Sequence, residues 1–123
     1  MSPDNCVLIY ADDDVLVREA LAMALEASGV AVRQCENGLE AIDLCREIHP
    51  GTMLLDINMP VLDGYETAHR VRADPNIAGT RLIAISGGSD RDANVRAMDA
   101  GFDAVLRKPV SMANLLKTVL EMP

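Results

Sequence analysis

Several side chains able to take part in metal or phosphoryl chemistry each stand at the end of a short apolar segment. They are Asp12, Asp13, Asp56, Ser86 and Lys108. Carboxylate oxygens ligate hard cations such as Mg²⁺, a lysine ammonium supplies a compact positive charge, and a serine hydroxyl can hydrogen-bond an anion. A carboxylate can also attack a phosphoryl group in line. If these groups converge, they would form a site that holds a phosphoryl group against a metal ion.

Each of these residues also has an ordinary structural explanation. An aspartate after a strand often caps the next helix, and we expect Asp14 to do so. Ser86 alone would be a turn residue, and Lys108 alone a solvated surface charge. These separate explanations do not account for the joint pattern, in which each residue follows the same end of its own apolar segment.

The apolar segments alternate with segments of helical spacing, which predicts an α/β fold. The apolar runs are residues 6–11, 30–35, 52–56, 81–86 and 104–107. Continuous runs of this length are typical of parallel strands covered by helices on both faces. We therefore expect one domain over residues 1–123, with its core at about 6–120, and a flavodoxin-like doubly wound (βα)5 fold with sheet order 2-1-3-4-5.

This topology predicts where the acidic residues meet. Ligands bind at the carboxyl ends of parallel strands, where the strand order reverses, which here is between the first and third strands. Asp12, Asp13 and Asp56 would converge at that point. Because like charges a few ångströms apart repel one another, three carboxylates need a cation, and Mg²⁺ suits oxygen ligands with several retained waters.

Local spacing also predicts helix starts and one inward-facing side chain. Asn37 with Glu40 and Ser89 with Asp92 both fit N-terminal capping patterns. In the helix after Asn37 we expect Leu39 to face the core, together with other apolar residues at helical spacing.

Composition and charge exclude several partners. The 123 residues carry a net charge of −8, so we expect repulsion from nucleic acid and from anionic lipid. Cys6, Cys35 and Cys45 match no zinc or redox spacing, which favours reduced thiols. The polar N-terminus and the lack of a long apolar run predict neither a signal peptide nor a membrane span, so we expect a cytoplasmic protein.

Taken in order and with their spacing, these motifs resemble the receiver domain of bacterial two-component response regulators. The matching stretches are IYADDD at 9–14, MLLDINMP at 53–60 with DG at 63–64, AISG at 84–87, and GFD at 101–103 leading into LRKP at 106–109. They span nearly the whole chain, and residues 100–110 are similar to receivers attached to hybrid sensor kinases.

The resemblance implies a metal site and a phosphoacceptor. Asp56 would accept the phosphoryl group. Asp13 and Asp56 would ligate Mg²⁺ directly, together with the backbone carbonyl of Asn58, and Asp12 would hold a metal-bound water.

The resemblance also implies how the site works. Ser86 would move to hydrogen-bond the phosphoryl group, Lys108 would pair with it, and Pro109 would follow a cis peptide bond. The donor would be a phosphohistidine on a histidine kinase or a histidine phosphotransfer domain. The domain would not be an enzyme, apart from catalysing its own phosphorylation and dephosphorylation.

The chain departs from the family pattern at two positions. Val105 stands where the family usually has Tyr or Phe, and Val110 replaces the aromatic residue that usually follows Lys-Pro. Neither change touches the groups that would do the chemistry. We therefore expect signalling through Ser86 and backbone shifts, without a rotating aromatic side chain.

Two other functions remain open from the sequence. One is a degenerate receiver that acts as an interaction module without phosphorylation, an alternative that Val105 keeps open. The other is a small phosphohydrolase with an aspartyl-phosphate intermediate, similar to haloacid-dehalogenase-like enzymes. Those enzymes usually have a second Asp where this chain has Asn58, and they usually carry a cap domain. The sequence names no output and does not tell a free-standing regulator from a piece of a longer protein.

Overall fold

The computed structural model describes residues 7–87 and 92–120 of the chain. Within these residues, five parallel strands form a single sheet in the order β2-β1-β3-β4-β5, which confirms the predicted topology. The strands are β1 (Val7–Ala11), β2 (Ala31–Cys35), β3 (Thr52–Asp56), β4 (Arg81–Ser86) and β5 (Ala104–Arg107). The more polar β2 lies at an edge of the sheet, where one side of the strand has no neighbouring strand among the described residues.

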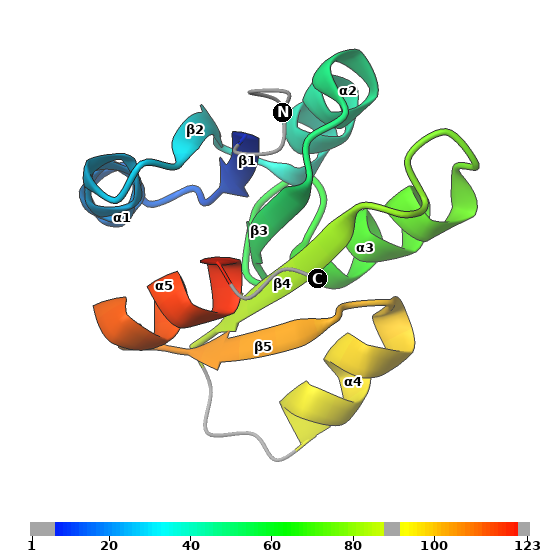
Figure 1. Ribbon diagram of the computed structural model, residues 1–123. Helices are drawn as coiled ribbons and strands as arrows, with labels where there is room; N and C mark the ends of the chain where they lie inside the picture. The colour runs from blue at the N-terminus through cyan, green and yellow to red at the C-terminus, as the bar shows by residue number, and fades with distance from the viewer. Residues whose placement is uncertain (1–6, 88–91, 121–123) are drawn as a thin grey trace.

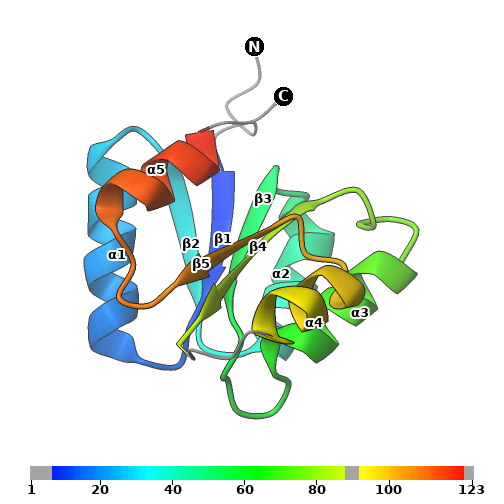
Figure 2. The same cartoon turned by 90° about the horizontal axis from the view of Figure 1, so that it is seen from below.

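Of the described helices, four connect successive strands, a fifth follows β5, and together they cover both faces of the sheet. They are α1 (Val15–Ala27), α2 (Gly38–Ile48), α3 (Gly64–Ala73), α4 (Asp92–Ala100) and α5 (Met112–Leu120). Helices α1 and α5 lie on one face, and α2, α3 and α4 lie on the other (Figure 1, Figure 2). No helix within the described ranges has both the length and the apolar character needed to cross a bilayer.

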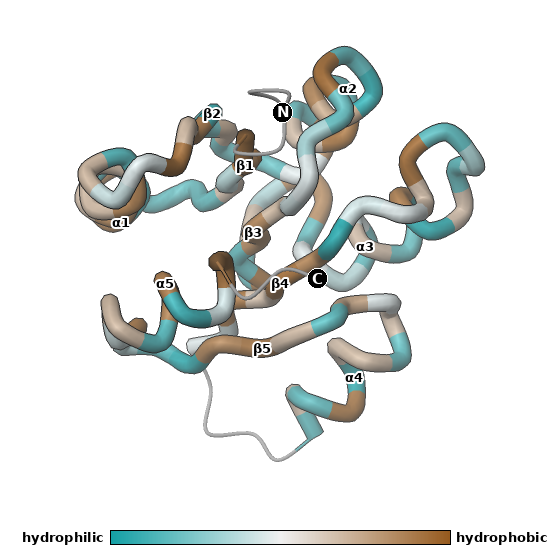
Figure 3. The backbone as a smooth tube through the Cα atoms, viewed as in Figure 1, coloured by the Kyte–Doolittle hydropathy of each residue, from teal (hydrophilic) through white to brown (hydrophobic). Residues whose placement is uncertain are grey.

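The core consists of two apolar layers, one on each side of the sheet. Strand β3 is buried along its whole length because both of its faces are covered. Successive side chains point to opposite layers, so Leu54 packs with residues of α1 and α5, whereas Leu55 packs with residues of α2, α3 and α4. Figure 3 shows the hydrophobic residues concentrated along the central strands.

The capping predictions are mostly confirmed. Asp14 caps α1, with its carboxylate accepting the Val17 N–H at 3.2 Å. Asn37 caps α2 by accepting the Glu40 N–H at 3.0 Å. The Glu40 carboxylate reaches back to the N–H of Glu36, one residue earlier than a reciprocal capping box requires. The cap expected at Ser89 lies outside the described residues.

The prediction for Leu39 is wrong, because its side chain is 41% exposed. The buried residues of α2 are Gly38, Ala41, Ile42 and Cys45. They follow the i, i+3, i+4, i+7 spacing of a single helix face, and Leu39 lies on the flank of that face.

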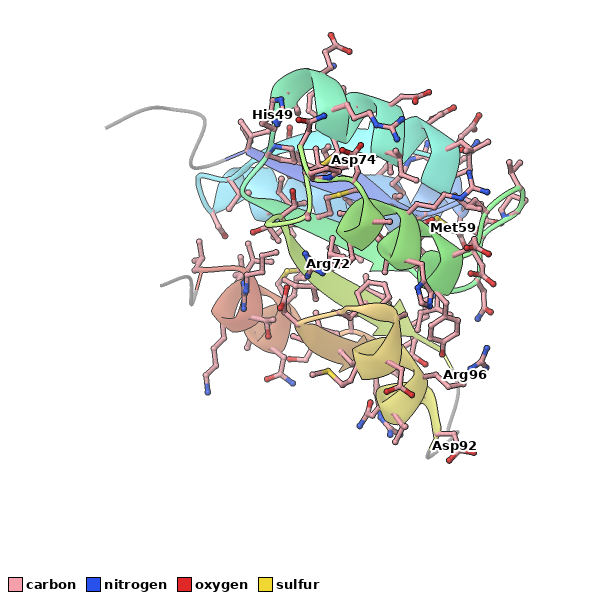
Figure 4. All side chains as sticks on the ribbon, turned by 90° about the vertical axis from the view of Figure 1, so that its right-hand side faces the viewer. His49, Met59, Arg72, Asp74, Asp92 and Arg96 are labelled. Atoms are coloured by element: carbon pink, nitrogen blue, oxygen red, sulfur yellow. The ribbon has the colours of Figure 1, made fainter. Side chains whose placement is uncertain are left out.

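Arg72, near the end of α3, joins segments that are distant in the sequence (Figure 4). Its guanidinium donates to the carbonyl oxygens of Ala78 and Thr80, both at 2.6 Å, and of Gly101 at 2.9 Å. It also donates to the Asp103 carboxylate at 2.9 Å. The Arg72 side chain therefore fixes the loops before β4 and β5 against α3.

A cation–π contact links α4 to α3. The guanidinium of Arg96 lies over the Tyr65 ring, 4.3 Å from its centroid (Figure 4). This contact adds to the apolar packing between the two helices.

Candidate functional site

Three carboxylates meet at the carboxyl ends of β1 and β3, as the sequence predicts. One oxygen from each of Asp12, Asp13 and Asp56 lies within 4.8 Å of the others. We call these three residues the acidic cluster. Asp12 and Asp56 are buried, whereas Asp13 is exposed. The parallel pairing of Ala11 with Leu55 explains the convergence, because the next residue on each strand is the aspartate.

The carboxylate of Asp12 has a fixed orientation. Its Oδ1 accepts the Asp14 N–H at 2.9 Å, and its Oδ2 accepts the hydroxyl of Tyr10 at 2.9 Å. Arg18 donates to the Asp12 carbonyl oxygen at 2.7 Å. Neither Tyr10 nor Arg18 is among the site residues predicted from the sequence. The spacing of Tyr10 was the available signal, since residues two apart in a strand share one face.

Asp56 is buried against Lys108 and the loop that follows β3. Lys108 Nζ lies 2.6 Å from Asp56 Oδ2, and the Asn58 N–H donates to Oδ1 at 2.9 Å. The Asp56 side chain is 2% exposed, and that of Lys108 is 36% exposed. The structure thus brings Asp56, Asn58 and Lys108 together, with the Asn58 N–H rather than its carbonyl in contact with Asp56.

The acidic cluster contains more negative charge than Lys108 neutralises. Burial raises the pKa of Asp56, and the nearby charge of Asp12 adds to the effect, while the bonds from Lys108 and Asn58 oppose it. Burial alone would lower the pKa of Lys108, but its hydrogen bond to Asp56 and the charges of the cluster raise it overall. Three carboxylates beside one ammonium would leave net negative charge in the acidic cluster, and a further cation would offset it.

Backbone hydrogen bonds tie together the strand ends that carry these side chains. The Lys108 N–H donates to the Ser86 carbonyl at 2.8 Å, and the Ile57 N–H donates to the Ile85 carbonyl at 3.0 Å. Ser86 is buried at the end of β4, one residue beyond Ile85, the register partner of Asp56. The Lys108–Pro109 peptide bond is cis, as expected.

Gly64 allows α3 to start directly against the loop after Asp56. A Cβ at position 64 would lie 2.7 Å from Ile57 Cα and 2.8 Å from the carbonyl oxygen of Asp56. The Gly64 N–H donates to the Ile57 carbonyl at 2.8 Å, and Asp63 caps the helix by accepting the Glu66 N–H. The helix start is therefore packed on the backbone of Asp56 and Ile57.

The two positions that depart from the family pattern are half-buried. Val105 packs against the core layer beneath α2, α3 and α4, and Val110 packs against the opposite layer. A pocket between α4 and the segment after β5 is lined by Asn94, Val105, Val110 and their neighbours.

With this geometry established, comparison with known proteins identifies the family. The family model of the response regulator receiver domain matches residues 7–120. The chain belongs to this family. Response regulator MprA of Mycobacterium sp. (strain KMS) is 32% identical over 109 residues, which are 89% of this chain and 46% of that protein. The chain therefore spans about half the length of the MprA relatives it matches.

Shorter relatives match over most of both chains. The polar-differentiation response regulator DivK of Brucella ovis is 29% identical over 112 residues, 91% of each protein. Among solved structures, the receiver domain of the Francisella response regulator 1452 has a TM-score of 0.88 and 25% identity, covering 95% of both chains.

A further solved structure shares the fold. It is the receiver domain of sensor histidine kinase PA1611 from Pseudomonas aeruginosa, described with a magnesium ion coordinated in its active site cleft. Its TM-score is 0.87 at 22% identity, over 95% of this chain and 96% of that one.

Proposed function

We propose that this receiver domain accepts a phosphoryl group from a phosphohistidine donor onto Asp56, in a Mg²⁺-dependent reaction that switches its conformation. The observation that carries the proposal is the convergence of the acidic cluster with Lys108 on the carboxyl edge of the sheet. Membership of the receiver family supports it.

The proposed transfer is a displacement reaction at phosphorus. A carboxylate oxygen of Asp56 attacks the phosphorus atom and forms an O–P bond, while the P–N bond to the donor imidazole breaks. The bonding electron pair returns to the imidazole nitrogen. Lys108, which bonds Asp56 at 2.6 Å before the reaction, would then pair with a phosphoryl oxygen. Hydrolysis of the resulting acyl phosphate, catalysed by the domain itself, would restore Asp56.

The donor set of the acidic cluster fits Mg²⁺. The available ligands are oxygens, which this cation prefers, and the exposed Asp13 keeps the cluster open to solvent. We propose that Asp13, Asp56 and the Asn58 carbonyl ligate the ion, and that Asp12 holds one of its waters. Bound there, Mg²⁺ would neutralise charge that develops on the phosphoryl oxygens. The PA1611 receiver, which shares the fold, is described with magnesium in its cleft.

We propose that the switch uses Ser86 and the backbone of β4 and β5. Ser86 would hydrogen-bond the phosphoryl group, and the Lys108 N–H to Ser86 carbonyl bond would transmit its movement to β5. Val105 has no ring to rotate, so the change should appear as shifts of the backbone around it. Identical amide spectra around Val105 in the phosphorylated and unphosphorylated forms would contradict this part of the proposal.

The proposed partner is a histidine kinase or a histidine phosphotransfer domain. Both carry the phosphohistidine that the reaction requires. The identity of the kinase and of the downstream protein is not encoded in the site, because the chemistry would be the same for every phosphohistidine donor.

Intact mass spectrometry tests the proposal. The protein is incubated with acetyl phosphate, with and without Mg²⁺, beside the variant Asp56→Asn. We expect one added phosphoryl group, dependent on Mg²⁺ and absent in the variant. If a phosphohistidine donor also leaves no adduct, and Mg²⁺ does not bind, the domain is instead an interaction module that works without phosphorylation.

A further inference from the structure

Tyr10 is a buried tyrosine whose hydroxyl points into the acidic cluster. Its side chain is 0% exposed, and its ring packs in the apolar layer beneath α1 and α5. The hydroxyl donates to Asp12 Oδ2 at 2.9 Å. Because the two residues are two positions apart, the ring and the carboxylate extend from the same face of the chain.

We propose that Tyr10 is a positioning residue for the metal site, acting by holding the Asp12 carboxylate in one orientation. This inference rests on the proposed function and concerns a residue to which that function assigns no role. Each oxygen of the carboxylate has one fixed donor, the Tyr10 hydroxyl on Oδ2 and the Asp14 N–H on Oδ1. Each oxygen can accept a further hydrogen bond, so a carboxylate held in this orientation could hold a metal-bound water in the cluster.

Of the two donors to Asp12, only the Tyr10 hydroxyl can be removed by a side-chain substitution. The Asp14 N–H belongs to the turn that starts α1, so it remains in place as long as the helix does. The Tyr10 hydroxyl is a side-chain group that a single substitution removes while the ring stays in the core. Tyr10→Phe therefore separates the orientation of Asp12 from the packing of β1.

A pocket next to Tyr10 limits how much Mg²⁺ affinity Tyr10→Phe is expected to lose. A pocket of about 400 Å³ lies next to Tyr10 and Asp12, between α1 and the segment that contains Lys108 and Pro109. It is large enough to admit water, which could replace part of the lost hydrogen bond in Tyr10→Phe. Loss of a partner of a direct metal ligand lowers metal affinity by about 10- to 100-fold. Asp12 would contact the ion only through a water, so we expect no more than the lower end of that range, about 10-fold.

The test measures Mg²⁺ affinity by amide chemical-shift titration of wild type, Tyr10→Phe, Asp12→Ala and the double variant. Tyr65→Phe is the matched control, because it removes a hydroxyl from the other described tyrosine and keeps its ring under Arg96. We expect about 10-fold weaker binding in Tyr10→Phe. We expect the Mg²⁺ affinity of Tyr65→Phe to stay within about 2-fold of the wild-type value, because the Tyr65 hydroxyl has no role in the proposed site.

The double variant separates positioning from a general structural effect. If the hydroxyl acts through Asp12, adding Tyr10→Phe to the Asp12→Ala variant should cause no further loss of Mg²⁺ affinity. The proposal would be overturned if Tyr10→Phe lowered Mg²⁺ affinity equally in the wild-type and Asp12→Ala proteins. It would also be overturned if Tyr10→Phe bound Mg²⁺ as tightly as the wild type. A wild-type protein that binds no Mg²⁺ would instead remove the proposed function, and this inference with it.

A second measurement covers the case in which Tyr10→Phe does not fold. In the wild-type protein, the ¹³C shift of Tyr10 Cζ should change as Mg²⁺ binds, because the hydrogen bond to Asp12 would alter. A Tyr10 signal that stays constant while the amides of the cluster respond would overturn the proposal.

Discussion

Replacing Gly64 by alanine tests whether α3 is packed against the backbone of the loop that follows Asp56. The new Cβ would lie 2.7 Å from Ile57 Cα and 2.8 Å from the Asp56 carbonyl oxygen, where 3.4 Å or more is ordinary contact. The helix start and the loop must therefore separate by about 0.7 Å, the difference between 3.4 and 2.7 Å. Both neighbours are backbone atoms, so no flexible side chain can absorb the movement.

The expected cost follows from two opposing terms. Overpacking costs about 1–3 kcal/mol, and the separation also stretches the Gly64 N–H to Ile57 carbonyl bond. The lower chain entropy of alanine in the unfolded state returns less than about 1 kcal/mol. We expect Gly64→Ala to lower the free energy of unfolding by about 1–2 kcal/mol in urea titrations. Phosphorylation of Asp56 should slow as well, by up to about 100-fold, because the acceptor moves with its loop.

Gly79→Ala is the matched control. A Cβ at position 79 meets nothing within 4 Å, so the substitution should be neutral or stabilise the protein by up to about 1 kcal/mol. If Gly64→Ala were as stable as Gly79→Ala and were phosphorylated at the wild-type rate, the close packing of α3 on this loop would be refuted.

Two further predictions concern groups outside the acidic cluster. Arg72→Ala should lower the free energy of unfolding by roughly 2–4 kcal/mol, because three carbonyls and Asp103 lose a charged donor. Arg70→Ala, at an exposed position of the same helix, should change the free energy of unfolding by less than about 0.5 kcal/mol. Equal effects of the two substitutions in urea titrations would contradict this prediction. In a Cys6→Ser background, the buried thiols of Cys35 and Cys45 should resist a thiol reagent at neutral pH until urea unfolds the protein. Burial raises the pKa of Cys35 to about 11 and raises that of Cys45, so both remain protonated until the pH is well above neutral, and rapid labelling of the folded protein would contradict the burial.

The sequence predicts the strands and their order because the relevant physics is local. Each central strand is a continuous apolar run, and the rules for parallel sheets then leave few topologies. The convergence of Asp12 with Asp56 follows from the same rules, since both residues come directly after paired positions on neighbouring strands.

Features that depend on three-dimensional contacts were not predictable in this way. The spacing of Tyr10 places its ring on the same face of the chain as Asp12, but only the structure shows that its hydroxyl bonds the Asp12 carboxylate. Arg72 joins carbonyls up to 29 positions away in the sequence, which no local pattern encodes. The exposure of Leu39 is not predictable either, because helical spacing gives the direction of a buried face but not its width.

Chemical identification of the modified residue tests the central claim most directly. The protein is phosphorylated by a phosphohistidine donor in the presence of Mg²⁺, reduced with borohydride, digested, and sequenced by tandem mass spectrometry. Borohydride converts an aspartyl phosphate to homoserine and leaves other aspartates unchanged. We predict homoserine at position 56, with Asp12 and Asp13 unmodified. Homoserine at either of those positions, or a phosphoryl group that survives reduction on another residue, would contradict the assignment of Asp56 as the phosphoacceptor.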